Sequence, residues 1–130
     1  MVPLPSTKAI LVVDDEADLR QLVMVILRDR YTVVEAANGY QALRLLDHEF
    51  APVGRKGRIA AVLLDIMMPG MDGLTVLRRI KTEFNLPVIM MTVKSDARHV
   101  MAALQNGADE YIVKPFTADL LLEKLKKVVG

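Results

Sequence analysis

The amino-acid sequence predicts an α/β protein built on a doubly wound, five-stranded parallel sheet with strand order 2-1-3-4-5. Short apolar runs bounded by turn residues alternate with segments whose apolar residues recur at helical spacing. Charged or hydroxyl side chains directly follow most of these runs, at the edge where open α/β sheets bind ligands. A chain of 130 residues fits one such domain and its core. We therefore expect a flexible N-terminal tail at 1–7 and a single (βα)5 domain at 8–130.

The apolar runs identify the strands. Ile59 to Leu64 is an uninterrupted apolar stretch, which is typical of a strand buried on both faces and is too short to span a membrane as a helix. The other runs are likewise rich in Val, Ile and Leu or Met and end at polar residues or turns. The predicted strands are Lys8–Val13, Tyr31–Glu35, Ile59–Leu64, Val88–Met91 and Glu110–Val113.

The segments between the strands carry one apolar face each, as surface helices do. Asn85-Leu-Pro87 and Asn106-Gly107 are typical helix stops, and Ser95 is a typical helix start. The predicted helices are Asp18–Asp29, Tyr40–Glu49, Leu74–Phe84, one from the Ser95 cap to Asn106, and Ala118–Val128.

Composition excludes several classes of function. Without cysteine the chain has neither disulfides nor thiol catalysis, and a net charge of +1 gives no bulk attraction for nucleic acid or an anionic membrane. No apolar run reaches the ~20 residues of a spanning helix. We expect a cytoplasmic protein. The basic stretch Ala51 to Arg58 is predicted to be a solvated loop whose role is open.

The residues at the strand ends suggest a chemistry. Asp14 and Asp15 follow the first strand, Asp65 the third, Thr92 the fourth and Lys114 the fifth. An Asp after a strand is often only a helix cap, but this strand order brings all five residues to one edge. Three carboxylates so close would repel one another, so a cation should lie among them, and Mg²⁺ prefers such oxygen ligands. With a lysine and a hydroxyl beside them, the set is typical of phosphoryl transfer to a carboxylate.

Four motifs, in this order, resemble the receiver domain of bacterial two-component response regulators, of the chemotaxis-regulator type. The resemblance extends from Lys8 to Val129. The motifs are Val-Val-Asp14-Asp15-Glu, Leu-Leu-Asp65-Ile-Met-Met-Pro-Gly-Met-Asp-Gly73, Met-Met-Thr92 and Asn-Gly-Ala-Asp-Glu-Tyr111-Ile-Val-Lys114-Pro115-Phe116.

The resemblance implies a flavodoxin-like fold and a phosphoacceptor site. Asp65 would take a phosphoryl group from a histidine kinase or a phosphotransfer protein. Asp15, Asp65 and the backbone carbonyl of Met67 would bind Mg²⁺, or Mn²⁺ in its place, with Asp14 acting through water. Lys114 would contact the phosphoryl oxygens.

The resemblance also implies how the signal is passed on. Lys114 would be joined to Pro115 by a cis peptide bond, and Thr92 and Tyr111 would form a switch pair. The helix at 95–106, the fifth strand and the last helix would form a face for an output domain, a partner or a phosphorylation-dependent homodimer. Such a domain catalyses only its own phosphorylation and dephosphorylation and is not a turnover enzyme. It would contact neither nucleic acid nor membrane directly.

Three other functions compete. A haloacid-dehalogenase-like phosphatase would need a second Asp where Met67 stands, together with a cap domain. A pseudo-receiver that only binds partners would be expected to lack one of the acids or the lysine. A flavodoxin-like electron carrier would place its flavin phosphate against the acidic edge, which would repel it.

Met67 and Lys94 offer no group to orient an attacking water, and Val93 is bulky, so a phosphorylated form is expected to be long-lived.

Overall fold

The five strands form one parallel sheet in the order β2-β1-β3-β4-β5, which confirms the predicted topology. The computed structural model describes residues 8–50, 58–93 and 97–130. The predicted tail at 1–7, most of the basic loop, Lys94 and the Ser95 cap lie outside the described residues. The strands are β1 (Ala9–Val13), β2 (Thr32–Ala36), β3 (Ile59–Asp65), β4 (Val88–Val93) and β5 (Glu110–Lys114).

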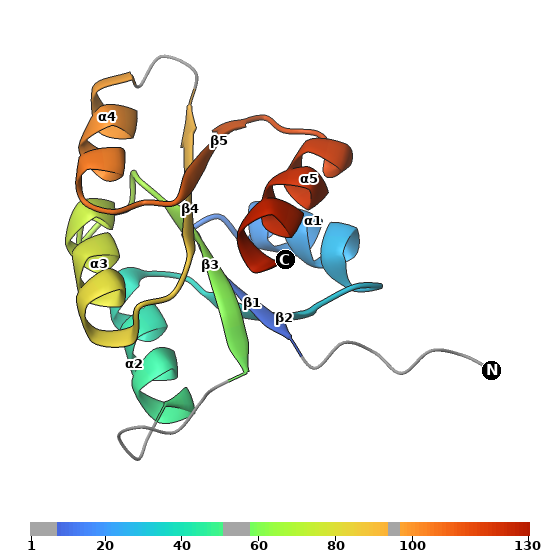
Figure 1. Cartoon of the computed structure of the whole chain (residues 1–130), viewed down its shortest axis with the longest axis horizontal. Helices are drawn as coiled ribbons and strands as arrows, with labels where there is room; N and C mark the ends of the chain where they lie inside the picture. Colours follow the sequence, from blue (N-terminus) through green and yellow to red (C-terminus); the bar gives the residue numbers. More distant parts are fainter. Residues whose placement is uncertain (1–7, 51–57, 94–96) are drawn as a thin grey trace.

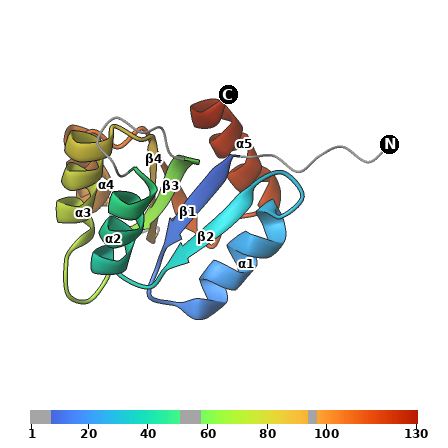
Figure 2. The ribbon, with the colours of Figure 1, turned by 90° about the horizontal axis from the view of Figure 1, so that it is seen from below.

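Helices cover both faces of the sheet, with α2, α3 and α4 on one side and α1 and α5 on the other (Figures 1 and 2). Asn38, Asp72 and Thr117 cap α2, α3 and α5 by accepting a backbone N–H in the first turn. The helices are α1 (Ala17–Leu27), α2 (Gly39–Glu49), α3 (Gly73–Arg79), the π-helical turn η1 (Ile80–Phe84), α4 (Ala97–Gln105) and α5 (Ala118–Val129).

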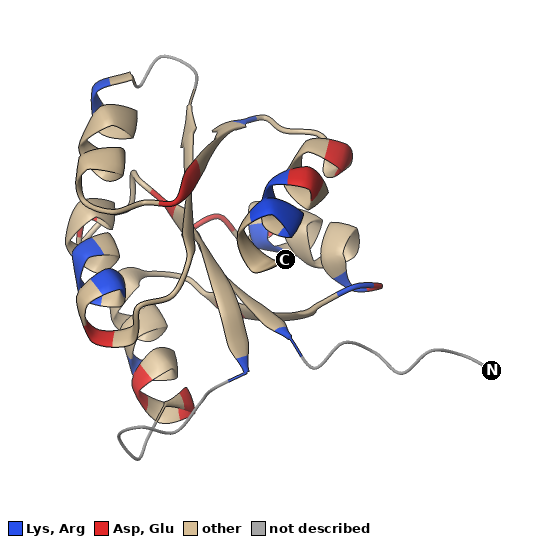
Figure 3. Ribbon diagram, viewed as in Figure 1, with Lys and Arg blue, Asp and Glu red and all other residues tan. Residues whose placement is uncertain are grey.

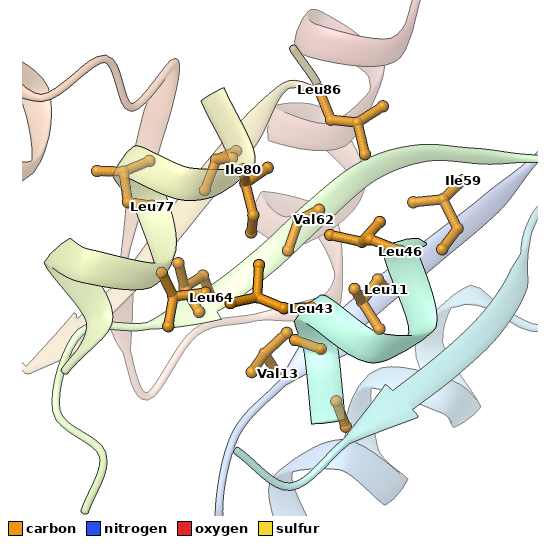
Figure 4. Packing of buried hydrophobic residues seen from close by; sticks show 14 of the residues in the cluster. Leu11, Val13, Leu43, Leu46, Ile59, Val62, Leu64, Leu77, Ile80 and Leu86 are labelled. Atoms are coloured by element: carbon orange, nitrogen blue, oxygen red, sulfur yellow. The ribbon is translucent and has the colours of Figure 1, made fainter. Parts of the chain in front are cut away.

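The central strands are apolar up to the polar residues near the carboxyl ends of β3 and β4, because both of their faces are buried. Alternate residues of β1 and β3 point to opposite sides, so Leu11 and Leu64 pack under α2 and α3 (Figure 4). Ile10 and Leu63 instead pack against α1 and α5. Each of these side chains is fully buried. The two cores hold the sheet rigidly, and the edge with the polar strand ends is therefore fixed in place.

The third helix differs from the sequence prediction in its last turn. A continuous helix to Phe84 was expected, but Ile80–Phe84 adopts the wider π-helical turn, in which the Asn85 N–H donates to the Ile80 carbonyl at 2.9 Å. Asn85 then takes the left-handed conformation, with φ 52°, and ends the helix where the sequence predicted. The apolar spacing gave no sign of the wider turn: Leu77 and Ile80 were expected to face inward, and both are buried.

No helix within 8–50, 58–93 or 97–130 combines the length and apolarity that crossing a membrane requires.

Candidate functional site

The register of the sheet brings four strand ends to one edge. Val13 lies beside Leu64, Asp65 beside Met91, and Thr92 beside Val113. Because all strands are parallel, the residues that follow β1 and those that end β3, β4 and β5 share the carboxyl edge. The predicted site residues therefore lie together.

Three carboxylates form a cluster at this edge. One oxygen from each of Asp14, Asp15 and Asp65 lies within 4.8 Å of the others. Asp14 is fully buried and Asp65 is 5% exposed, whereas Asp15 is exposed at the mouth of the site. Three acids with only oxygen donors, one of them open to water, are a donor set that suits a hard divalent cation.

Lys114 supplies positive charge between two of these acids. Its ammonium Nζ lies 2.7 Å from Asp14 Oδ2 and 3.4 Å from Asp65 Oδ2. The lysine ends β5, and its peptide bond to Pro115 is cis, as the resemblance implied. The expectation that a cation should lie among the carboxylates is met in part by the protein itself.

The environment changes the proton affinities of this pair. Burial raises the pKa of Asp65 to about 6, opposed by the Lys114 ammonium and reinforced by the Asp14 carboxylate. Burial alone would lower the pKa of Lys114, but its hydrogen bond to Asp14 and the attraction of both acids raise it above its ordinary value. Lys114 is therefore a cation near neutral pH. Its positive charge favours the ionised form of Asp65.

Backbone N–H groups hold the two buried acids in place. The Met67 N–H donates to Asp65 Oδ1 at 3.1 Å, and the Glu16 N–H donates to Asp14 Oδ1 at 2.8 Å. Each acid thus has one oxygen bonded by the loop that follows its own strand and the other near Lys114. Asp65 presents an ordered carboxylate toward the mouth of the site.

Thr92 and Tyr111 lie on the same face of the sheet. Tyr111 is paired with Met90, two residues before Thr92, so both side chains point to the side covered by α4. Thr92 is 2% exposed and its hydroxyl donates to the Val93 carbonyl at 3.3 Å. Tyr111 is 36% exposed as a whole residue, and Lys124 Nζ lies 5.3 Å from the centroid of its ring. It is a surface residue and not a core aromatic.

Apolar side chains surround the mouth of the site. Met67, two residues after Asp65, is 58% exposed, and Val93, directly after Thr92, is 50% exposed; neither side chain carries a carboxylate or an amide. The position at which a phosphatase of the haloacid-dehalogenase type would need its acid is thus an exposed thioether. Within the described segments, no second acid follows on this loop until Asp72, which caps α3.

Sequence reasoning missed Arg20 and Glu35. The Arg20 guanidinium donates to the backbone carbonyl of Asp14 and pairs with Glu35 of β2. A basic residue five positions after Asp15, combined with an acid on the strand next to β1, could have indicated this contact once the strand order was assumed.

Known proteins share both the sequence and the architecture of this chain. A family model described as the response regulator receiver domain matches residues 10–126. The chain is 36% identical over 118 residues to the DNA-binding response regulator MtrA of Mycolicibacterium paratuberculosis. The aligned region covers 90% of this chain and 49% of that protein. It is 37% identical over 121 residues to the transcriptional regulatory protein ResD of Bacillus subtilis, covering 92% and 47%. The chain spans about half the length of these curated relatives.

Solved structures agree with the sequence relatives. The receiver domain of NtrX from Brucella abortus has a TM-score of 0.81 at 35% identity, covering 92% of this chain and 97% of that chain. The Vibrio cholerae chemotaxis protein CheY4 has a TM-score of 0.81 at 28% identity, covering 95% and 99%. Since the match extends over nearly the whole sheet and includes every strand end at the acidic edge, the chain belongs to the receiver domain family of two-component response regulators.

Proposed function

We propose that this receiver domain accepts a phosphoryl group on Asp65 from the phosphohistidine of a histidine kinase or a phosphotransfer protein. The observation that carries the proposal is the Lys114 ammonium placed between Asp14 and Asp65, where it would meet a phosphoryl oxygen. A carboxylate oxygen of Asp65 attacks phosphorus, the P–N bond breaks, and its electron pair stays on the imidazole nitrogen, which takes a proton from solvent as the histidine leaves. Lys114 stabilises the charge on the phosphoryl oxygens throughout.

Asp15 and Asp65, the Met67 carbonyl and, through water, Asp14 would hold Mg²⁺ or Mn²⁺. The close spacing of the three carboxylates and the exposure of Asp15 support this assignment. When bound, the cation neutralises charge on the transferred phosphoryl group. The residues themselves bind and orient: backbone N–H groups fix Asp14 and Asp65, and Lys114 keeps two acids from repelling each other.

A protein donor is supported by the surface beside the site. A hollow of about 350 Å³ lies next to Lys114, between α1 and the segment that follows β5, and Leu19, Leu22 and Phe116 help to line it. Apolar lining beside the acidic mouth favours a partner that brings its own side chains along with the phosphoryl group.

The labelling experiment tests this proposal. With Mg²⁺ and acetyl phosphate, the wild-type chain should gain one phosphoryl group, because a small acyl phosphate needs only the carboxylate, the lysine and the cation. Intact-mass spectrometry should show at least a tenfold loss of labelling in Asp65→Asn, since an amide is a far weaker nucleophile; a tenfold change corresponds to about 1.4 kcal/mol of barrier. Asp72→Asn is the matched control, because Asp72 only caps α3 on the same loop. Equal labelling of wild type and Asp65→Asn would refute the assignment.

We propose further that the phosphorylated state is read through Thr92 and Tyr111. A phosphoryl group adds about −1 to −2 charge and strong acceptor oxygens, which would draw the buried Thr92 hydroxyl away from the Val93 carbonyl. Tyr111, exposed on the same face of the sheet, would then turn inward, and the face made by α4, β5 and α5 would change. An output domain, another partner or a second copy would bind that face. Contact with DNA, which the name of MtrA states for that protein, would belong to an output domain.

Beryllofluoride, which mimics the phosphoryl group, gives a direct test of this coupling. In its presence, the Tyr111 ring resonances and the amide resonances of β4, β5 and α4 should shift together in NMR spectra. Thr92→Ala should bind beryllofluoride yet lose most of the Tyr111 shift, because the hydroxyl that responds is gone. Thr75→Ala serves as the control, because it removes a hydroxyl from α3 that donates only to the cap residue Asp72. An identical Tyr111 response in Thr92→Ala would contradict the switch.

A further inference from the structure

Arg20 lies directly behind the acidic turn that follows β1. Its Nη1 donates to the backbone carbonyl of Asp14 at 2.6 Å, and its Nε lies 3.2 Å from Glu35 Oε1 on β2. The Arg20 side chain is 17% exposed, so the guanidinium is held among α1, β1 and β2 and is not a solvated surface charge. A planar guanidinium can serve both partners at once because its donors have a fixed geometry.

The carbonyl that Arg20 holds belongs to the peptide unit that joins Asp14 to Asp15. A peptide unit is planar, so fixing its oxygen also fixes the direction in which the chain enters Asp15. The other polar groups of Asp14 are engaged as well: its N–H donates to Ala36, and its carboxylate accepts from the Glu16 N–H and from Lys114. Asp14 is thereby held in place and anchors the residue that follows it.

The position of Asp15 depends on how firmly Asp14 is held. In the part of the chain that the structure describes, its exposed carboxylate has no hydrogen-bond or ion-pair partner that would orient it. Its oxygen nevertheless lies within 4.8 Å of those of Asp14 and Asp65. The backbone on both sides keeps it there: Arg20 bonds the peptide unit before Asp15, and the Asp14 carboxylate bonds the Glu16 N–H after it.

We infer that Arg20, oriented by Glu35, is a positioning residue that aims the Asp15 carboxylate at the cation site it forms with Asp65. The inference rests on the proposed function, because it assumes that this site takes Mg²⁺. Arg20 bonds the backbone carbonyl of Asp14, not a carboxylate of the site, and acts through the Asp14–Asp15 peptide.

Simple electrostatics predicts the opposite effect, which makes the inference testable. Removing a fixed positive charge from the neighbourhood of three acids would make the site more negative and tighten Mg²⁺ binding. Removing a group that positions a ligand would weaken it. The sign of the change in affinity therefore distinguishes the two roles.

The experiment measures the Mg²⁺ dissociation constant of the unphosphorylated chain by isothermal titration calorimetry. Arg20→Met should weaken binding about tenfold, the lower end of what lost support of a metal ligand usually costs. Arg20→Lys should weaken it as well, because a single ammonium does not reproduce the two-sided contact. Glu35→Gln should have a smaller effect of the same sign. The control is Arg79→Met, which breaks a similar pair with Glu83 on the far side of the sheet and should leave affinity unchanged.

A second readout needs no metal. In Mg²⁺-free NMR spectra the amide resonances of Asp15 and Glu16 should shift in Arg20→Met and stay in place in Arg79→Met. Unchanged or tighter Mg²⁺ binding by folded Arg20→Met would overturn the inference while leaving the proposed function intact. If Arg20→Met does not fold, Glu35→Gln decides, and wild-type affinity in that variant overturns the inference. Absence of any Mg²⁺ binding by the wild type would refute both.

Discussion

Replacing Lys114 with methionine should lower the free energy of unfolding by about 3 kcal/mol in the absence of divalent cations, because breaking a buried ion pair leaves an uncompensated charge. Lys114 is the ammonium that lies 2.7 Å from the fully buried Asp14 and 3.4 Å from Asp65. Methionine keeps approximately the length and the apolar stem of the side chain and removes the charge together with the hydrogen bond to Asp14. Urea denaturation near neutral pH, with a chelator present, measures the change.

Mg²⁺ should restore more stability to Lys114→Met than it adds to the wild type. In the variant the cation would enter a cluster of acids that nothing else neutralises, and binding to the folded state alone stabilises it by mass action. Lys127→Met is the matched control: its ion pair with Glu110, at 3.3 Å, involves a lysine that is 73% exposed, and such a pair contributes less than about 1 kcal/mol. Equal losses in the two variants would show that Lys114 does not support the buried acids.

The strands and their order could be predicted because the physics that determines them is local and repetitive. A strand buried on both faces is expected to be apolar, as β1 is throughout and β3 is as far as Leu64, whereas the edge strand β2 keeps Thr32 and Glu35 exposed. Parallel strands need helical crossovers, so alternating runs leave few topologies. The meeting of Asp14, Asp65, Thr92 and Lys114 at one edge followed from that topology alone.

Contacts between distant side chains could not be predicted in the same way. The Arg20–Glu35 pair joins α1 to β2, and the positions of the two residues indicate it only once the strand order is assumed. Lys124 lies over the Tyr111 ring, and Lys124 and Lys127 both pair with Glu110. These contacts form because α5 packs beside β5. Figure 3 shows the acidic start of the strand near basic turns of the helix. From the sequence alone, these lysines indicated only that positive charge lies near the C-terminal end of the last helix, where it is favourable.

These contacts matter for the proposed output face. Glu110 has a lowered pKa: burial opposes this, but the Tyr111 N–H and the two lysines of α5 stabilise its charged form more strongly. The carboxylate therefore stays ionised and links β5 to α5. The proposed inward turn of Tyr111 would break its contact with Lys124, so the face would change its charge pattern as well as its shape.

Gly73→Ala is expected to destabilise the fold by about 3 kcal/mol, at the upper end of what overpacking usually costs. A Cβ at this position, the first residue of α3, would lie 2.6 Å from the Ile66 carbonyl oxygen and 2.7 Å from that of Asp65. Both obstacles are backbone atoms at the end of β3, so no rotamer change relieves the collision. Either α3 moves away from the sheet or the strand end that carries Asp65 is displaced. Urea denaturation measures the first effect, and the rate of labelling by acetyl phosphate measures the second.

Gly70→Ala, in the same loop, separates this collision from ordinary backbone strain. Gly70 has φ 85°, which alanine adopts at a cost of roughly 1–2 kcal/mol, but its Cβ would meet nothing nearer than the Tyr40 ring at 3.9 Å. Gly70→Ala should therefore lose less stability than Gly73→Ala and should keep its labelling rate, because the end of β3 is not pushed. If Gly73→Ala stays within about 1 kcal/mol of the wild type and labels normally, then α3 can shift without moving Asp65. In that event the close approach of α3 to β3 does not position the phosphoacceptor.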